Sequence, residues 1–251
     1  MQNTQVRWTE LAREVVSPRD ASALPYPGAV PASALSSSMQ DYLKVIWTTQ
    51  EWDDSPVTSR ALAERFGVSP STVSEALKKL AAAGLVDHER YGTATLTDAG
   101  RAAALAMVRR HRLVETFLVD YLGYAWDEVH DEAEVLEHAV SDDFVERLSA
   151  RLGHPEFDPH GDPIPTADGR LPALDARPLV DVEAPARLRV VRVSDEDPAL
   201  LRHLVDLGMT LGVTLRLVER HDFAGTLAVE LDGTQRDLGH VAAAAIFVAP
   251  A

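Results

Sequence analysis

The chain contains no cysteine among its 251 residues. Disulfide bonds and thiolate metal sites are therefore excluded. Any metal ion would have to be held by oxygen and by imidazole nitrogen.

Long apolar runs are also missing. The longest, 241–250, is about half as long as a segment that spans a bilayer. The first residues carry charge at Arg7, Glu10, Arg13 and Glu14, where a signal peptide would have its apolar core. We therefore expect a cytoplasmic protein with no membrane partner.

Positive charge is scarce, with 24 Lys/Arg against 39 Asp/Glu and a net charge of −15. The imbalance is uneven along the chain: residues 56–112 hold nine Lys/Arg against five Asp/Glu, whereas residues 113–251 hold 11 against 27. An acidic total alone indicates no more than solubility. A basic segment followed by an acidic body instead predicts a local nucleic-acid-binding surface.

Composition and periodicity divide the chain into five segments. Residues 1–38, rich in Ser, Pro and Ala, are expected to form a flexible arm. Residues 39–102 predict short helices and a hairpin, and 103–152 predict two long helices, the second at about 131–152. Residues 153–185 contain seven prolines and predict a linker. Residues 186–251 predict a small β-barrel with one helix at 198–207, so the expected fold class is mainly α with a C-terminal all-β domain.

Within 39–102, helix, short turn, helix and hairpin follow in the order of a winged helix-turn-helix. Ser69 as N-cap and Pro70 at the first helical position predict the second helix of the motif. Small hydroxyl residues there suit groove entry and phosphate contact. The candidate DNA-binding residues are Arg60, Ser69, Pro70, Ser71, Thr72, Ser74, Glu75, Lys78, Lys79 and Arg90.

The two long helices carry His and Glu one helical turn apart, namely His111, Glu115, His130, Glu134, Glu137 and His138. Such residues lie above one another on one helix face. Carboxylates that close repel each other unless a cation lies between them. The pattern therefore predicts a divalent transition-metal site, and the surplus of apolar residues on these helices predicts a helical dimer interface.

Taken together, these motifs resemble the diphtheria-toxin-repressor family of metal-activated repressors, and within it the actinobacterial manganese regulators. The likeness covers roughly 39–251 and includes Arg109–Glu115, Val129–Glu134 and the segment Gly161–Pro165. The resemblance implies a winged helix-turn-helix DNA-binding domain, metal-binding and dimerisation helices, and an SH3-like (FeoA-like) C-terminal domain.

The resemblance also implies two ligand sets. The regulatory set falls on Asp41, Glu134, Glu137 and His138, where the iron-responsive branch has sulfur at the first two positions; oxygen there suits harder Mn2+. The second set falls on His111, Glu115 and His130, completed by Asp195 or Asp197. A departure from the pattern is Lys44, which stands where the short manganese regulators have a metal-bridging glutamate and so favours two separate sites. His160, beside Asp158 and Asp162, is expected to be structural.

The resulting prediction is a homodimeric, Mn2+-dependent repressor of metal-uptake genes that binds double-stranded operator DNA and has no small-molecule substrate. One alternative is an Fe2+-dependent regulator of the same family. Another is a carboxylate-bridged di-metal helical enzyme, which usually carries Glu-x-x-His on each of two helices, a pattern that this chain lacks. A third is an architectural DNA-binding protein with structural metals.

Overall fold

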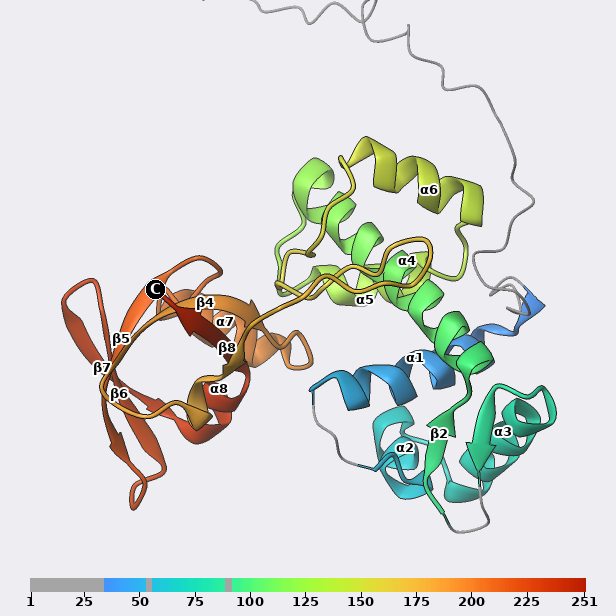
Figure 1. Ribbon diagram of the computed structural model, residues 1–251, viewed down its shortest axis with the longest axis horizontal. Helices are drawn as coiled ribbons and strands as arrows, with labels where there is room; N and C mark the ends of the chain where they lie inside the picture. The colour runs from blue at the N-terminus through green and yellow to red at the C-terminus, as the bar shows by residue number, and fades with distance from the viewer. Residues whose placement is uncertain (1–33, 53–55, 89–91) are drawn as a thin grey trace, which may run out of the picture.

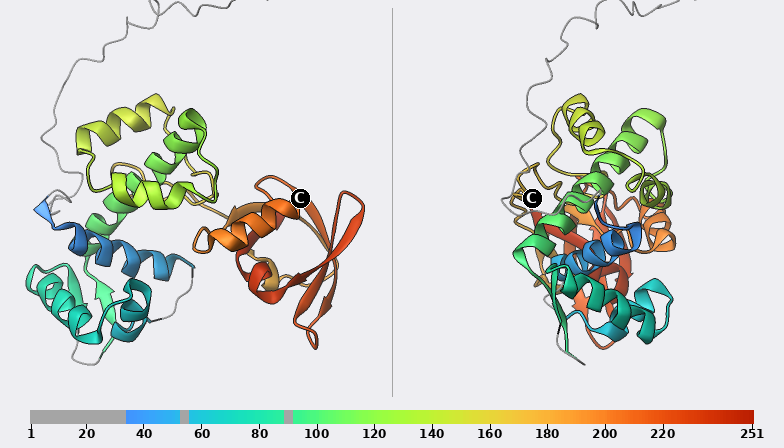
Figure 2. Two further views of the ribbon diagram at one scale, coloured as in Figure 1. Left: turned by 180° about the vertical axis from the view of Figure 1, so that it is seen from behind. Right: turned by 90° about the vertical axis from the view of Figure 1, so that its right-hand side faces the viewer.

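The computed structural model describes residues 34–52, 56–88 and 92–251. It shows a helical body that carries a separate β-barrel on one side (Figures 1 and 2). This arrangement confirms the predicted fold class. Most of the predicted arm, residues 1–33, lies outside the described residues, as does Arg90.

The N-terminal unit is a winged helix-turn-helix built on strong local signals. Thr58 caps one helix through Ala61 N, Gly67 ends it in the left-handed conformation, and Ser69 caps the next helix ahead of Pro70. Leu43, Ile46, Leu62, Val73 and Leu77 are among the residues of its buried core. Its elements are α1 (Ser37–Trp52), α2 (Ser59–Phe66), α3 (Pro70–Ala82), β1 (Val86–His88) and β2 (Ala94–Leu96).

The middle unit consists of α4 (Asp98–Leu122), α5 (Val129–Leu136) and α6 (Asp142–Arg151). The prediction of one continuous helix over 131–152 is wrong. The segment contains no glycine or proline, but Ser141 accepts a hydrogen bond from Phe144 N and starts a new helix with Asp142 and Asp143 in its first turn. An N-cap residue of this kind stabilises a helix start inside a run that periodicity alone would continue.

The proline-rich segment is ordered where it crosses the helical body. Asp158, His160, Asp162 and Ile164 are buried, and Phe157 and Pro163 form an isolated antiparallel bridge. Its last residues already belong to the barrel, because β3 (Arg177–Pro178) pairs with β8 and the 3-10 turn η2 (Leu179–Asp181) follows. This segment thus connects the two bodies and also packs between them.

The barrel is a six-stranded antiparallel sheet in the order β3-β8-β4-β5-β6-β7. Strand β7 was not predicted because its sequence is mostly polar, although Asp232 and Gly233 before it both have positive φ and form a two-residue hairpin turn. The other elements are β4 (Ala186–Val193), α7 (Pro198–Asp206), β5 (Thr214–His221), β6 (Thr226–Leu231), β7 (Thr234–Gly239), α8 (His240–Ala244) and β8 (Ile246–Pro250).

The barrel contacts the helical body at several points. Trp126, in the loop between α4 and α5, packs against the barrel core. Val193 N at the end of β4 donates a hydrogen bond to His160 O, and Arg202 on α7 pairs with Asp127. None of the helices in the described ranges has the length and apolar character needed to cross a bilayer.

Candidate metal centre and DNA-binding surface

The first group of candidate ligands joins α1 to the end of α5. His138 Nε2 lies 2.8 Å from Asp41 Oδ1 and 3.5 Å from Glu137 Oε1. Gln40 was not predicted; its Oε1 lies 2.7 Å from His138 Nδ1. A hydrogen bond at one ring nitrogen orients the other nitrogen toward a ligand position. Three of the four predicted regulatory residues therefore converge here.

The fourth, Glu134, faces Lys44 instead. Lys44 Nζ lies 2.7 Å from Glu134 Oε1, 2.6 Å from Glu137 Oε1 and 3.5 Å from His111 Nδ1. The ammonium group therefore contacts residues of both predicted ligand sets. Burial lowers its pKa, but the two glutamates outweigh that effect and raise the pKa above its usual value. A fixed positive charge at this place supports the prediction of two separate sites.

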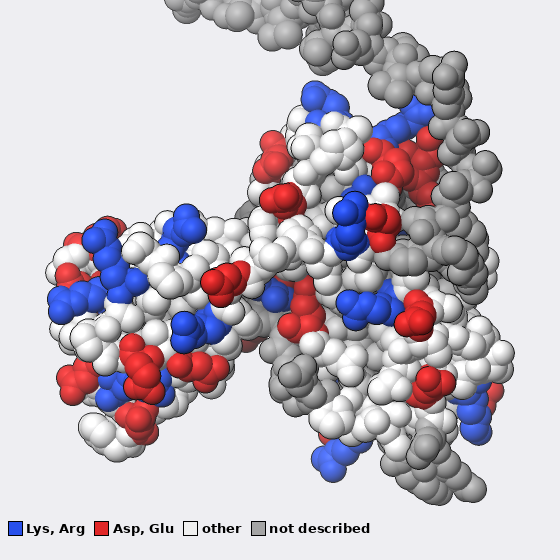
Figure 3. Space-filling view, viewed as in Figure 1, with Lys and Arg blue, Asp and Glu red and all other residues white. Residues whose placement is uncertain are grey.

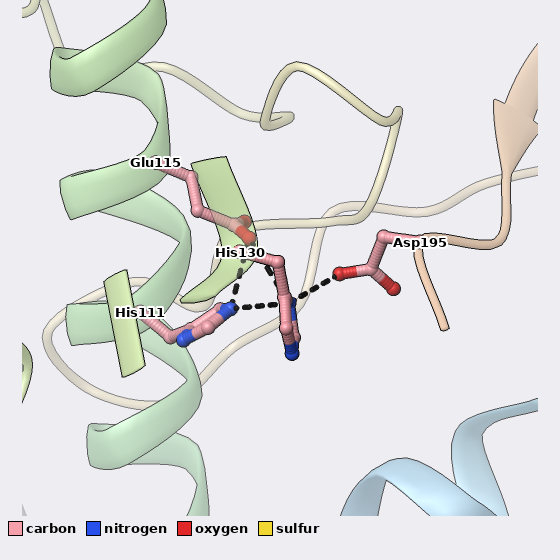
Figure 4. A group of neighbouring side chains, drawn as sticks. All are labelled: His111, Glu115, His130 and Asp195. Carbon is pink, nitrogen blue, oxygen red and sulfur yellow. Dashed lines mark hydrogen bonds and ion pairs between the residues drawn. The ribbon is translucent and has the colours of Figure 1, made fainter. Parts of the chain in front are cut away.

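The second group brings together His111 and Glu115 from α4, His130 from α5 and Asp195 from the loop after β4 (Figure 4). His111 Nε2 lies 2.9 Å from Glu115 Oε1, and His130 Nδ1 lies 2.9 Å from Asp195 Oδ2. Glu115 is fully buried. The barrel thus supplies a carboxylate to a cluster that is otherwise helical.

Asp197, the other residue predicted for this position, is not part of the cluster. Its Oδ1 accepts hydrogen bonds from Ala199 N at 2.8 Å and Leu200 N at 3.3 Å, so it is the N-cap of α7. Because Pro198 occupies the first helical position, a capping carboxylate at Asp197 is locally favoured.

His160, expected from sequence to be structural, is fully buried and hydrogen-bonded to the backbone. Its Nε2 donates a hydrogen bond to Trp126 O at 2.7 Å, and its Nδ1 lies 4.0 Å from Glu115 Oε2. Glu115, Asp158 and His160 form a buried group with metal-ligand spacing. The signal in the sequence was the Asp158-Pro159-His160 motif, but only the fold brings it to Glu115.

The donors fit a divalent ion of intermediate hardness. Both Glu115 oxygens and His160 Nδ1 are buried without a well-directed hydrogen bond, and buried polar atoms of this kind call for a partner. All the grouped donors are carboxylate oxygen or imidazole nitrogen, a combination suited to Mn2+ or Fe2+.

The charged side chains of the second group strongly shift one another's pKa values. Burial lowers the pKa of both histidines, but the charge of Glu115 beside His111 and the hydrogen bond that His130 donates to Asp195 outweigh it, raising these pKa values to about 9 and about 10. Burial raises the pKa of Glu115, yet the positive charge of His111 brings it down to about 2. The cluster without metal is therefore a set of protonated imidazoles and ionised carboxylates.

Metal binding should consequently release protons. Because the raised pKa values keep His111 and His130 protonated at pH 7, a divalent metal ion would have to displace about two protons from this group, and its apparent affinity should rise with pH until about pH 9 to 10. Titration calorimetry in buffers of different ionisation enthalpy measures the protons released. Heats that do not depend on the buffer would show that the imidazoles are already neutral.

The predicted recognition helix α3 presents its polar residues to solvent. Ser71, Thr72, Glu75, Lys78 and Lys79 are exposed, and the apolar side of the helix is buried in the core. Of the other candidates, Ser69, Pro70 and Arg60 are exposed and Ser74 is half-buried. On the face shown in Figure 3, acidic and basic side chains are intermixed, so the net negative charge forms no large single-sign patch there.

Three family models match successive parts of the chain. The iron dependent repressor N-terminal DNA-binding domain matches residues 34–94, and the iron dependent repressor metal-binding and dimerisation domain matches 97–166. The FeoA domain matches 177–250. These matches follow the winged helix-turn-helix, the helical unit and the barrel in order.

Individual proteins agree with the models. The diphtheria toxin repressor of Corynebacterium diphtheriae is 30% identical over 196 residues, which cover 74% of this chain and 86% of that protein. The iron-dependent repressor IdeR of Mycobacterium tuberculosis is 39% identical over 131 residues, 52% of this chain; the match spans 56% of that protein's length. A solved structure of a manganese-dependent transcriptional repressor in complex with manganese is 56% identical, with a TM-score of 0.81, and covers 85% of this chain and 100% of that chain.

Proposed function

Because the chain belongs to the diphtheria-toxin-repressor family of metal-dependent transcriptional repressors, we propose that it is a manganese-activated repressor that binds operator DNA as a homodimer and controls metal-uptake genes. This family consists of DNA-binding regulators, which removes the di-metal enzyme alternative. The observation that carries the choice of manganese over iron is that the donors linking α1 to α5 include the Asp41 carboxylate, at a position where the iron-responsive branch has sulfur.

The residues of the first group connect the metal centre to the DNA-binding unit. Asp41 lies on α1, whose Tyr42, Leu43 and Ile46 are buried in the core of the winged helix-turn-helix. A bound divalent cation would supply the positive charge that holds Asp41, Glu137 and His138 together. The orientation of α3 relative to the dimerisation helices then depends on these side chains, and metal binding and DNA binding become linked reciprocally.

The proposed dimer has a surface available on the helical unit. Tyr121 and Leu122 at the end of α4, Val135 on α5 and Phe144 on α6 are exposed large apolar residues. A contiguous exposed apolar patch marks an interaction site, and we propose that these residues contribute to one. Two copies joined here would place two α3 helices for half-sites on DNA.

The decisive experiment is a DNA-binding titration with Mn2+, Fe2+ and Zn2+ in parallel, using a duplex selected from a random library in the presence of Mn2+. We expect binding to appear at the lowest free concentration with Mn2+. Activation by Fe2+ at lower free concentration than Mn2+ would instead assign the chain to the iron-responsive regulators. Equal binding with a chelator present would support an architectural protein.

DNA binding should be salt-dependent despite the acidic total charge. Lys78 and Lys79 are exposed on α3, and a dimer using them with backbone amides would neutralise on the order of 6 phosphates. Lys79→Ala should lower the log–log salt slope by about two per dimer without changing the preferred sequence, whereas Lys79→Arg should retain the slope. Affinity measured between low and high salt tests this, and an altered sequence preference would place Lys79 on base edges instead.

A further inference from the structure

The barrel meets the helical body at a joint formed by residues 158–162 and 191–193, which we call the docking joint. The pairing of β4 with β8 shifts register between Val190 and Arg192. An irregularity of this kind adds a residue to one strand and redirects the side chains that follow. Here it occurs where the proline-rich segment approaches β4.

The backbone contact at the joint is too close for a side chain. A Cβ atom on Gly161 would lie 2.2 Å from Val191 O, and the glycine has a φ of 86°. The adjacent His160 O accepts a hydrogen bond from Val193 N at 2.9 Å. The turn and the strand are therefore in direct main-chain contact on both sides of Arg192.

The side chain of Arg192 extends from β4 toward the helical body and is part of a buried ionic network. Its guanidinium pairs with Asp162 and lies 3.5 Å from Glu51 on α1, and it also stacks over the Phe247 ring at 5.3 Å. Arg112 on α4 binds the same two carboxylates, at 3.1 Å to Glu51 Oε1 and 3.3 Å to Asp162 Oδ1. These four charged side chains are at most 8% exposed. They join α1, α4, the proline-rich turn and β4.

Arg192 lies three residues before Asp195 in the chain. A stretch of three residues spans at most about 10 Å, so the position of Asp195 follows closely from that of Arg192. The proposed metal ligand on the barrel therefore depends on how the barrel is docked.

We infer that Arg192 is a positioning residue that docks the barrel on α4 and α1 and so brings Asp195 to His130. The inference rests on the proposed metal function of that cluster. Through Glu51, the same side chain ties the barrel to the first helix of the DNA-binding unit. Docking and metal ligation are thus separate tasks, performed by Arg192 and by Asp195.

Two measurements separate these tasks. Bound Mn2+ is counted by elemental analysis after dialysis against a fixed free Mn2+ concentration that just saturates the wild type. Barrel docking is measured without metal, as the distance between spin labels on Arg147→Cys in α6 and Asp206→Cys in α7. Both positions are exposed, and the chain has no other cysteine. Dilution with unlabelled protein isolates distances within one chain.

Arg192→Met should broaden the distance distribution and weaken Mn2+ binding at one site about 10- to 100-fold, the loss typical of groups that position ligands. Asp195→Ala should lose the same Mn2+ equivalent but retain the narrow distribution. Arg192→Lys should recover part of both properties. Arg189→Met, an exposed arginine on the same strand, should change neither.

Gly161→Ala disturbs the docking joint at the proline-rich turn instead of at β4. It replaces Arg192→Met in the experiment if that variant does not fold. It should broaden the distances and weaken the same site without any change of charge. The inference is overturned if Arg192→Met and Gly161→Ala leave either readout at its wild-type value, since docking and Mn2+ binding would then be independent. If the wild type bound no Mn2+, the proposed function would fail, while the spin-label distances would still decide the docking role.

Discussion

Replacing His138 with alanine should reduce DNA binding in the presence of Mn2+ to the level of wild-type protein with a chelator. His138 Nε2 is 2.8 Å from Asp41 Oδ1, and this contact connects the end of α5 to α1. Without the imidazole, the first group loses its nitrogen donor and the DNA-binding unit loses a link to the dimerisation helices. Fluorescence anisotropy with the selected duplex, with and without Mn2+, measures the effect.

His138 is a better position for this test than Glu137. Glu137 is fully buried and is one of the two carboxylates that contact the Lys44 ammonium, so its removal would also weaken the neutralisation of a buried charge and destabilise the fold. His203→Ala, at an exposed position on α7, is the matched control and should bind DNA like the wild type. The proposed switch is wrong if wild-type protein binds the duplex equally well with and without metal.

The neighbouring aspartates of the barrel should respond in opposite ways to substitution. Asp195→Ala should lower bound Mn2+ by about one per chain, because its carboxylate lies 2.9 Å from His130 Nδ1 and Mn2+ takes about six ligands. Asp197→Ala should leave the Mn2+ count unchanged. It should instead lower the free energy of unfolding by about 1 kcal/mol, since it removes the N-cap of α7.

Elemental analysis and denaturant unfolding of the two variants distinguish these effects. Both substitutions remove one carboxylate from the same loop and so change the net charge equally. Any difference between the two variants in bound Mn2+ therefore results from the position of the carboxylate. Loss of Mn2+ from the Asp197 variant would contradict its assignment as a cap. An unchanged count in both would mean that the barrel contributes no metal ligand.

The sequence by itself determined the elements whose signals are local. Thr58, Gly67 and Ser69-Pro70 define both helices of the helix-turn-helix, because capping depends on a few neighbouring backbone groups. Helical spacing likewise placed His111 and Glu115 on one face of α4, and the structure shows them 2.9 Å apart. Such features require no knowledge of distant segments.

Local sequence patterns do not predict the structure where they favour two different conformations. Residues 131–152 continue an apolar pattern that predicts one helix, yet the chain turns after Leu136 and restarts at the Ser141 cap. That turn leaves Glu137 and His138 at the end of α5, facing Lys44 and Asp41. Packing against α1 and α4 involves segments far away in the sequence, so periodicity could not predict it.

Only the tertiary structure decided which residues complete the clusters. Asp195 and Asp197 are the same residue type and lie two residues apart, but the barrel as docked through β4 and the 158–162 turn directs one to His130 and the other to the start of α7. Tertiary packing likewise brings His160 near Glu115 and Gln40 to His138. Metal-ligand spacing across domains depends on rigid-body docking, and docking is held by buried contacts such as Arg192 with Asp162, which carry no signature in the linear sequence.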